Sequence, residues 1–183
     1  WEKFKEENPT SFNGDKMRIE RMEISGNELH IVLSNSITFA DIMYTNITKT
    51  KKGTPTTPLE TYSVPKEGTL VTRPEFSNAA SVGAVVKFTD TEEPTYIFSI
   101  RSNNTTQPGT ISLAINGYVD QMDESLNPLI DNLYKEAEEE MLIKDDEINE
   151  NNFLGPAQMR GKGCDLIWVL EPSITYKEWA KRY

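Results

Sequence analysis

The sequence holds one cysteine, one histidine and no long apolar run, and each scarcity excludes a class of protein. The single cysteine, Cys164, rules out an intrachain disulfide, which fits a reducing compartment. With His30 as the one histidine, neither a Ser/His/Asp nor a Cys/His nucleophile set is supported. No stretch approaches the roughly 18–20 apolar residues of a membrane span, and residues 1–7 carry no apolar signal-peptide core. We therefore expect a cytoplasmic protein without a membrane partner.

Basic residues are also few. The chain has 19 Lys and Arg against 29 Asp and Glu, which gives a formal net charge of −10 over 183 residues. This balance argues against a broad electrostatic footprint for nucleic acid or for anionic membrane. It leaves a phosphorylated small molecule open as a substrate, because a bound metal ion can reverse the sign of the local charge.

The first part of the chain is predicted to be rich in β-strands. Apolar residues alternate with polar ones between turn residues, which indicates an antiparallel meander. The expected strands are residues 17–22, 29–33, 37–44 and 69–72, with a turn at 25–27 and a linker at 49–58. We expect a β-rich N-terminal region over residues 1–76 and a second domain over 77–183.

The second part alternates strands with one well-defined helix. The expected strands are residues 82–88, 95–100, 110–115 and 165–170, with Trp168 in the core. A helix is predicted from about Pro128 to Met141, since proline suits a first helical turn. Residues 145–152 are expected to form a charged loop, residues 155–163 a glycine-rich loop, and residues 176–183 to begin another helix.

The predicted helix carries carboxylates three and four residues apart, after a glycine turn at Gly117. Glu136, Glu139 and Glu140 therefore project from one side of the helix. Three converging carboxylates repel one another unless a cation lies among them, and a hard divalent ion takes oxygen ligands of this kind. The sequence thus favours a site for Mg²⁺ or Mn²⁺ on this helix.

The angular positions of the glutamates bear on this hypothesis. At about 100° per residue, with Glu136 at zero, Glu140 falls at roughly 40°, Glu139 at roughly 300° and Glu138 near 200°. The apolar side chains fall at roughly 20° to 100°, and they are Leu129, Leu133 and Ala137. Glu136 and Glu140 should therefore lie against the buried side, where unpaired charge is costly. The alternative is an acidic helix face that is merely solvated.

Residues 81–170 resemble the Nudix hydrolase superfamily. Its signature is a glycine, five residues, a glutamate, seven residues, then Arg-Glu-apolar-any-Glu-Glu-any-Gly-apolar. Gly117 matches the first glycine, and residues 135–143 align with the second half. Lys135 replaces the arginine, Leu142 replaces the later glycine, and the connection from Glu124 to Lys135 is three residues longer than the pattern.

The resemblance implies an α/β (α+β) fold, a Nudix-like α/β/α sandwich with a mixed sheet, after the β-rich N-terminal portion. It also implies Mg²⁺- or Mn²⁺-dependent hydrolysis of a nucleoside diphosphate linked to another moiety, for example a nucleotide sugar. Glu136, Glu139 and Glu140 would hold the metal with the backbone carbonyl near Gly117, and Glu139 or Glu140 would orient or deprotonate the attacking water.

The resemblance gives supporting roles to two further positions, and the place of Arg101 after a predicted strand suggests a third. Glu124, or Asp123 at strict spacing, and Lys135 would orient the ligands without touching the ion. Arg101 would contact substrate phosphate, and a plain surface role for it stays open. The expected partners are a small nucleotide diphosphate and, through the N-terminal region, a second copy of the chain. Two alternatives remain: a non-catalytic module that binds nucleotide or protein on the same fold, and a structural domain with a solvated acidic helix.

Overall fold

The structure, a computed structural model, describes residues 2–7, 12–42, 77–102, 108–121, 125–158 and 164–183. Its contacts divide the chain into two compact units. The first contains the described parts of Trp1–Ala80, Val119–Gln121 and Gln158–Cys164. The second contains those of Ser81–Tyr118, Met122–Ala157 and Asp165–Tyr183. The division at residues 76 and 77 expected from the sequence stays a prediction.

The first unit is built on a long antiparallel hairpin. It contains α1 (Glu2–Glu7), β1 (Asp15–Ser25) and β2 (Glu28–Thr38). Gly26 has a φ of 62° in the tight turn between the strands, a conformation that glycine adopts at little cost. In the register of the pair, Met22 lies opposite Ile31 and Ile24 opposite Leu29. The alternation read in the sequence therefore did form a hairpin.

The third strand expected over residues 37–44 is wrong from Phe39 onward, because residues 39–42 are helical. Asp41 explains the change: its Oδ2 accepts hydrogen bonds from the backbone N of Thr38 at 2.7 Å and from Thr38 Oγ1 at 2.8 Å. The bond from the Thr38 backbone to the Asp41 side chain resembles one half of a capping box, with the helix beginning where β2 ends. Residues 43 and 44, the linker at 49–58 and the strand expected at 69–72 lie outside the described residues.

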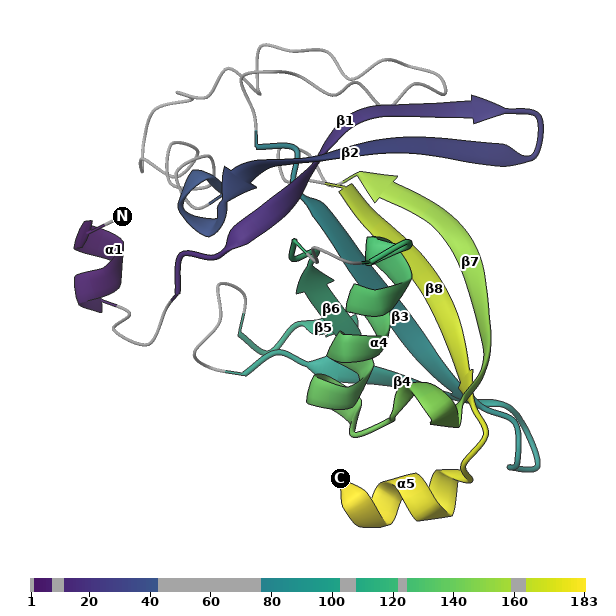
Figure 1. Cartoon of the computed structure of the whole chain (residues 1–183). Helices are drawn as coiled ribbons and strands as arrows, with labels where there is room; N and C mark the ends of the chain where they lie inside the picture. The colour runs from purple at the N-terminus through teal and green to yellow at the C-terminus, as the bar shows by residue number, and fades with distance from the viewer. Residues whose placement is uncertain (1, 8–11, 43–76, 103–107, 122–124, 159–163) are drawn as a thin grey trace. The chain divides into compact units, whose positions relative to one another are not determined.

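The second unit is centred on a mixed β-sheet. Its strands are β3 (Ala80–Phe88), β4 (Thr95–Ile100), β5 (Ile111–Leu113), β6 (Ile115–Tyr118), β7 (Ile148–Gln158) and β8 (Cys164–Pro172). The order of five strands is β5-β4-β3-β8-β7. The sixth strand, β6, is outside this order and pairs with β3. β3 is antiparallel to both β4 and β6, whereas β3 and β8 run in the same direction in Figure 1. The expected α/β class with a mixed sheet is confirmed.

Three expectations for this unit are corrected. Gly117 does not form a turn; it lies within β6, opposite Val82 of β3. Residues 145–152 are not a loop, because a short 3-10 helix, η1 (Asp145–Glu147), leads directly into β7. The glycine-rich loop expected from residue 155 likewise begins inside β7, and residues 159–163 lie outside the described part of the chain.

The helix α4 (Pro128–Met141) begins and ends where the sequence predicts. The Asn127 side chain accepts a hydrogen bond from Ile130 N, which caps the first turn ahead of Pro128. α4 packs against β6 and covers one face of the sheet (Figure 1), and its Leu133, Ala137 and Met141 are buried. This face is the core of the unit.

The far end of the same core is closed by α5 (Tyr176–Arg182), at the position where the sequence predicts the start of a helix. The Trp179 ring lies 5.4 Å from the Phe88 ring at the end of β3, measured between centroids. The opposite face of the sheet is less covered, since Tyr96, Phe98 and Ile100 are each at least half exposed. No helix within the described residues is long and apolar enough to cross a membrane.

Candidate functional site

The candidate site begins where α4 crosses β6. Gly117 of β6 faces Glu136 of α4 so closely that a Cβ at position 117 would lie 2.7 Å from Glu136 Cγ and closer still to its carboxylate. The missing side chain at position 117 is therefore what admits the Glu136 carboxylate. The sequence linked Gly117 and Glu136 through the family signature, and the structure brings them into direct contact.

One turn further along α4, Glu140 reaches the same strand. Its Oε2 accepts a hydrogen bond from the backbone N–H of Asn116 at 2.7 Å. Burial raises the pKa of Glu140 above its ordinary value of 4.5, and the Glu139 charge adds to this increase. The Asn116 N–H and the Arg101 charge act in the opposite direction and lower the pKa. The carboxylate thus lies in a partly dehydrated position although the residue as a whole is exposed.

The other glutamates of the helix are more open. Glu138 and Glu139 are both exposed, and Glu139 is near enough to Glu140 for its charge to act on that carboxylate. Over the described ranges, no group of three or more His, Cys, Asp or Glu side chains is arranged to hold a metal ion. Glu136 and Glu140 are therefore held along β6, with Glu139 beside them, rather than closed around one point.

Arg101 brings a positive charge to this side of the sheet. Its backbone continues the β4–β5 ladder, since Arg101 N donates to Thr110 O and Gly109 N donates to Arg101 O. Along β4 every second side chain is exposed, and the last of these is Ile100. Arg101 is next in the alternation, so its side chain lies on the other face of the sheet, which is the α4 face. Its Nε is buried and, among the described residues, has no hydrogen-bond partner. A buried donor without an acceptor is costly, which makes this nitrogen a candidate contact for an anion.

The remaining predicted residues fall in three groups. Lys135 is half-buried in α4, next to Glu136. Glu124 and its alternative Asp123 lie outside the described residues, so their supporting role stays a prediction. Trp168 is confirmed as a core residue, 5% exposed, with its ring 4.8 Å from that of Phe153.

Sequence reasoning missed the hydrogen bond from Asn116 to Glu140. The donor is a backbone N–H, which every residue except proline carries, so no residue type in the sequence signals it. The extended conformation of β6 could have suggested the bond, because strand N–H groups without a partner strand require another acceptor. Because the sequence predicts a turn at Gly117, it does not predict the strand that carries this N–H group.

No family model matches the sequence, and no curated protein matches it. Among solved structures, the crystal structure of Shewanella oneidensis NrtR is similar over 50% of this chain and 42% of that chain, with 18% identity and a TM-score of 0.38. The crystal structure of C. elegans Ap4A hydrolase is similar over 51% of this chain and 67% of that chain, with 15% identity and a TM-score of 0.37. The chain spans less than half the length of the first of these.

Proposed function

We propose that this protein is a divalent-metal-dependent hydrolase of a nucleoside diphosphate linked to another moiety, with Glu136, Glu139 and Glu140 as metal ligands. One observation carries the proposal: a partly dehydrated carboxylate, Glu140, lies within electrostatic reach of Arg101, whose Nε is buried without a partner. These two opposite charges lie near each other at a half-buried site but do not pair directly. Such a site favours a ligand that carries both a cation and an anion, such as a metal diphosphate.

The residues present fit a hard cation. The donors are oxygens only, and two of them are held against β6: Glu136 by the space above Gly117, and Glu140 by the Asn116 N–H. Mg²⁺ and Mn²⁺ favour such oxygen donors and keep several waters, so a set of carboxylates open on one side suits them. When bound, such an ion supplies charge neutralisation at the diphosphate and a more acidic water.

The chain's own residues then have separate tasks. Asn116 N–H fixes one Glu140 oxygen, and Glu140 or Glu139 accepts the proton of the attacking water. The water oxygen bonds to phosphorus while the bridging P–O bond breaks, and Arg101 Nε donates to a phosphate oxygen. The backbone carbonyl near Gly117 completes the ligand set, and Lys135 and Glu124 have the supporting roles that the signature implies.

The finer parts of the proposal follow from the same hypothesis. The substrate is a small nucleotide diphosphate such as a nucleotide sugar, and neither nucleic acid nor membrane is a partner. The protein acts in the cytoplasm, where a single cysteine stays reduced. The N-terminal β-rich region is the proposed contact of a homodimer.

A second candidate function is a nucleotide-binding module without turnover. It is favoured by the absence, among described residues, of a closed carboxylate group, and by Lys135 and Leu142 at the positions where the signature has arginine and glycine. Such a module would bind a metal nucleotide through the same residues and release it unchanged.

The test is a screen of diphosphate substrates with Mg²⁺, comparing the wild type with Glu139→Gln and Glu140→Gln. We expect each substitution to lower the rate of nucleoside monophosphate release by about 10²–10⁴-fold, as loss of a general base or charge ligand does. Glu138→Gln is the matched control, because Glu138 is exposed on the same turn and is predicted to point away. Mg²⁺-dependent nucleotide binding without release favours the binding module. If no nucleotide binds and Mn²⁺ leaves Tm unchanged, both functions are overturned.

A further inference from the structure

The amino-acid composition of the last turn of α4 is electrostatically unfavourable. It carries Glu138, Glu139 and Glu140 and no basic residue. The C-terminal end of a helix already has a partial negative charge and carbonyl groups that lack partners within the helix. This end therefore needs donors and positive charge from another part of the chain.

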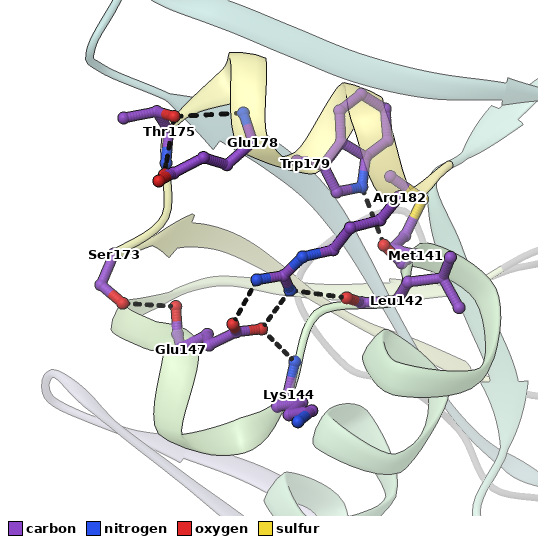
Figure 2. Close-up of polar contacts among 9 residues, drawn as sticks. All are labelled: Met141, Leu142, Lys144, Glu147, Ser173, Thr175, Glu178, Trp179 and Arg182. Carbon is purple, nitrogen blue, oxygen red and sulfur yellow. Dashed lines mark hydrogen bonds and ion pairs between the residues drawn. The ribbon is translucent and has the colours of Figure 1, made fainter.

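Helix α5 supplies both (Figure 2). Trp179 Nε1 donates to Met141 O at 2.8 Å, and Arg182 Nη1 donates to Leu142 O at 3.3 Å. The two acceptors directly follow Glu140 in the chain, so α5 holds the backbone next to the candidate site. Trp179 is 7% exposed and cannot leave without uncovering Phe88, against which its ring packs.

Arg182 also fixes the segment that follows α4. Its two terminal nitrogens donate to the two Glu147 carboxylate oxygens, each at 2.7 Å, and Glu147 Oε2 accepts a further bond from Lys144 N at 3.1 Å. Leu142 has a φ of 55°, a left-handed conformation that residues with a side chain rarely adopt. The surrounding contacts therefore hold this helix end in a conformation that it would not keep by itself.

The start of α5 is held as well. Thr175 and Glu178 form a reciprocal cap, and Tyr176 N donates to both Asp90 carboxylate oxygens at 3.0 and 3.2 Å. A helix of this length is not stable alone. It is stable here because its first turn, its middle and its last turn are each attached to the sheet or to α4.

We infer that α5 is a positioning element for the candidate site: Trp179 and Arg182 hold the last turn of α4 and thereby keep Glu140 on the Asn116 N–H. The catalytic part of this inference rests on the proposed function, whereas the effect on the Asn116 hydrogen bond does not. When the α5 contacts are lost, the last turn frays first, because helix ends open at low cost. Glu140 lies on that turn, and Glu136, one turn earlier, is affected less.

The experiment compares Trp179→Phe and Arg182→Gln with the control Lys181→Gln in the full chain. Trp179→Phe keeps a ring against Phe88 but removes the indole donor, and Lys181 is an exposed residue of the same helix. Hydrogen exchange at the Asn116 amide reports directly on its bond to Glu140. We expect exchange about 10-fold faster in the two test variants, and the Mg²⁺ concentration for half-maximal rate about 10-fold higher with a smaller change in kcat.

Two further variants keep the inference falsifiable if the first ones fold poorly. Arg182→Lys retains the charge but loses the two-pronged contact with Glu147, so it should behave like Arg182→Gln at Asn116. Leu142→Gly removes the strained left-handed leucine, so combining it with Arg182→Gln should recover part of the lost protection.

The outcomes separate the two proposals. If the wild type turns over no diphosphate but Asn116 exchange responds as expected, the proposed function fails and the positioning role stands. If Trp179→Phe and Arg182→Gln lower Tm yet match Lys181→Gln in both Asn116 exchange and Mg²⁺ dependence, α5 is only a structural helix and the inference is overturned. Failure of Leu142→Gly to recover any protection also counts against it.

Discussion

Two carboxylates seven residues apart, Glu140 and Glu147, have pKa values displaced in opposite directions. The Arg182 guanidinium, followed by the Lys144 N–H, lowers the pKa of Glu147 from 4.5 to about 2. Burial raises the pKa of Glu140, and the single Asn116 N–H and the Arg101 charge offset this only in part. The negative charge of Glu147 is therefore compensated by its surroundings, and that of Glu140 is not.

The difference marks Glu147 as a member of a structural ion pair and Glu140 as a candidate site residue. Both Glu147 oxygens accept hydrogen bonds from Arg182, so its charge is compensated within the fold. Glu140 accepts one hydrogen bond among the described residues, and its neighbour Glu139 repels it. Displaced acids with unsatisfied charge gather at functional sites, whereas satisfied ion pairs are structural.

The largest effect is expected from Gly117→Ala. The added Cβ would overlap the Glu136 carboxylate, which is the flexible end of a side chain and can swing away. We therefore expect a small change in Tm but a fall of about 100-fold in Mg²⁺-dependent turnover, because a ligand is displaced. Activity assays and thermal unfolding on the same preparation measure the two effects.

Gly83→Ala is the matched control for this change. Gly83 lies on β3, paired with Asn116, and a Cβ there would meet Leu113 Cδ1 at 2.6 Å, on the face away from α4. It should lower Tm at least as much as Gly117→Ala and leave turnover within about 3-fold of the wild type, because its side chain would lie on the face of the sheet opposite Glu136. Equal losses of turnover in both variants would contradict a ligand role for Glu136.

How much of this site the sequence predicts depends on how local each feature is. The start of α4 follows from Pro128, and the angular argument places Ala137 in the core and Glu138 outside it. These are properties of one helix, and helical geometry fixes them. The pairing of β6 with β3 is not local, so the sequence predicts a turn at Gly117, which is a strand residue.

The same reasoning explains the missed strand. β7 contains Asn149, Asn151 and Asn152, residue types depleted in strands, and its exposed stretch lacks clear alternation. Pairing with β8 at the edge of the sheet overrides that weak preference. Likewise, no sequence rule links Trp179 or Arg182 to α4, because those contacts depend on the tertiary placement of α5.

A smaller effect is expected from Arg101→Gln. Loss of the guanidinium removes the proposed donor to phosphate, so we expect the substrate KM to rise about 10-fold, the range for a hydrogen bond to a charged group. The Arg101 charge lowers the pKa of Glu140, so its removal should shift the acid limb of the pH–rate profile to higher pH. Arg21→Gln, at an exposed arginine of β1, is the control. An unchanged KM with an unchanged profile would assign Arg101 to the surface role.

The smallest effect concerns the satisfied acid. The pKa of Glu147 is depressed in the folded protein, so its ionised form stabilises the fold above about pH 4.5, and this stabilisation is lost as the pH falls to about 2. Arg182→Gln should therefore lower Tm by about 2 °C at pH 7, as expected for a mostly solvent-screened ion pair. The gap between the two proteins should close as the pH approaches 2. Thermal unfolding followed across this range, with Lys181→Gln as control, measures it. A gap independent of pH would mean that Arg182 acts through its bond to Leu142 O rather than through Glu147, and the contrast with Glu140 would then rest on burial alone.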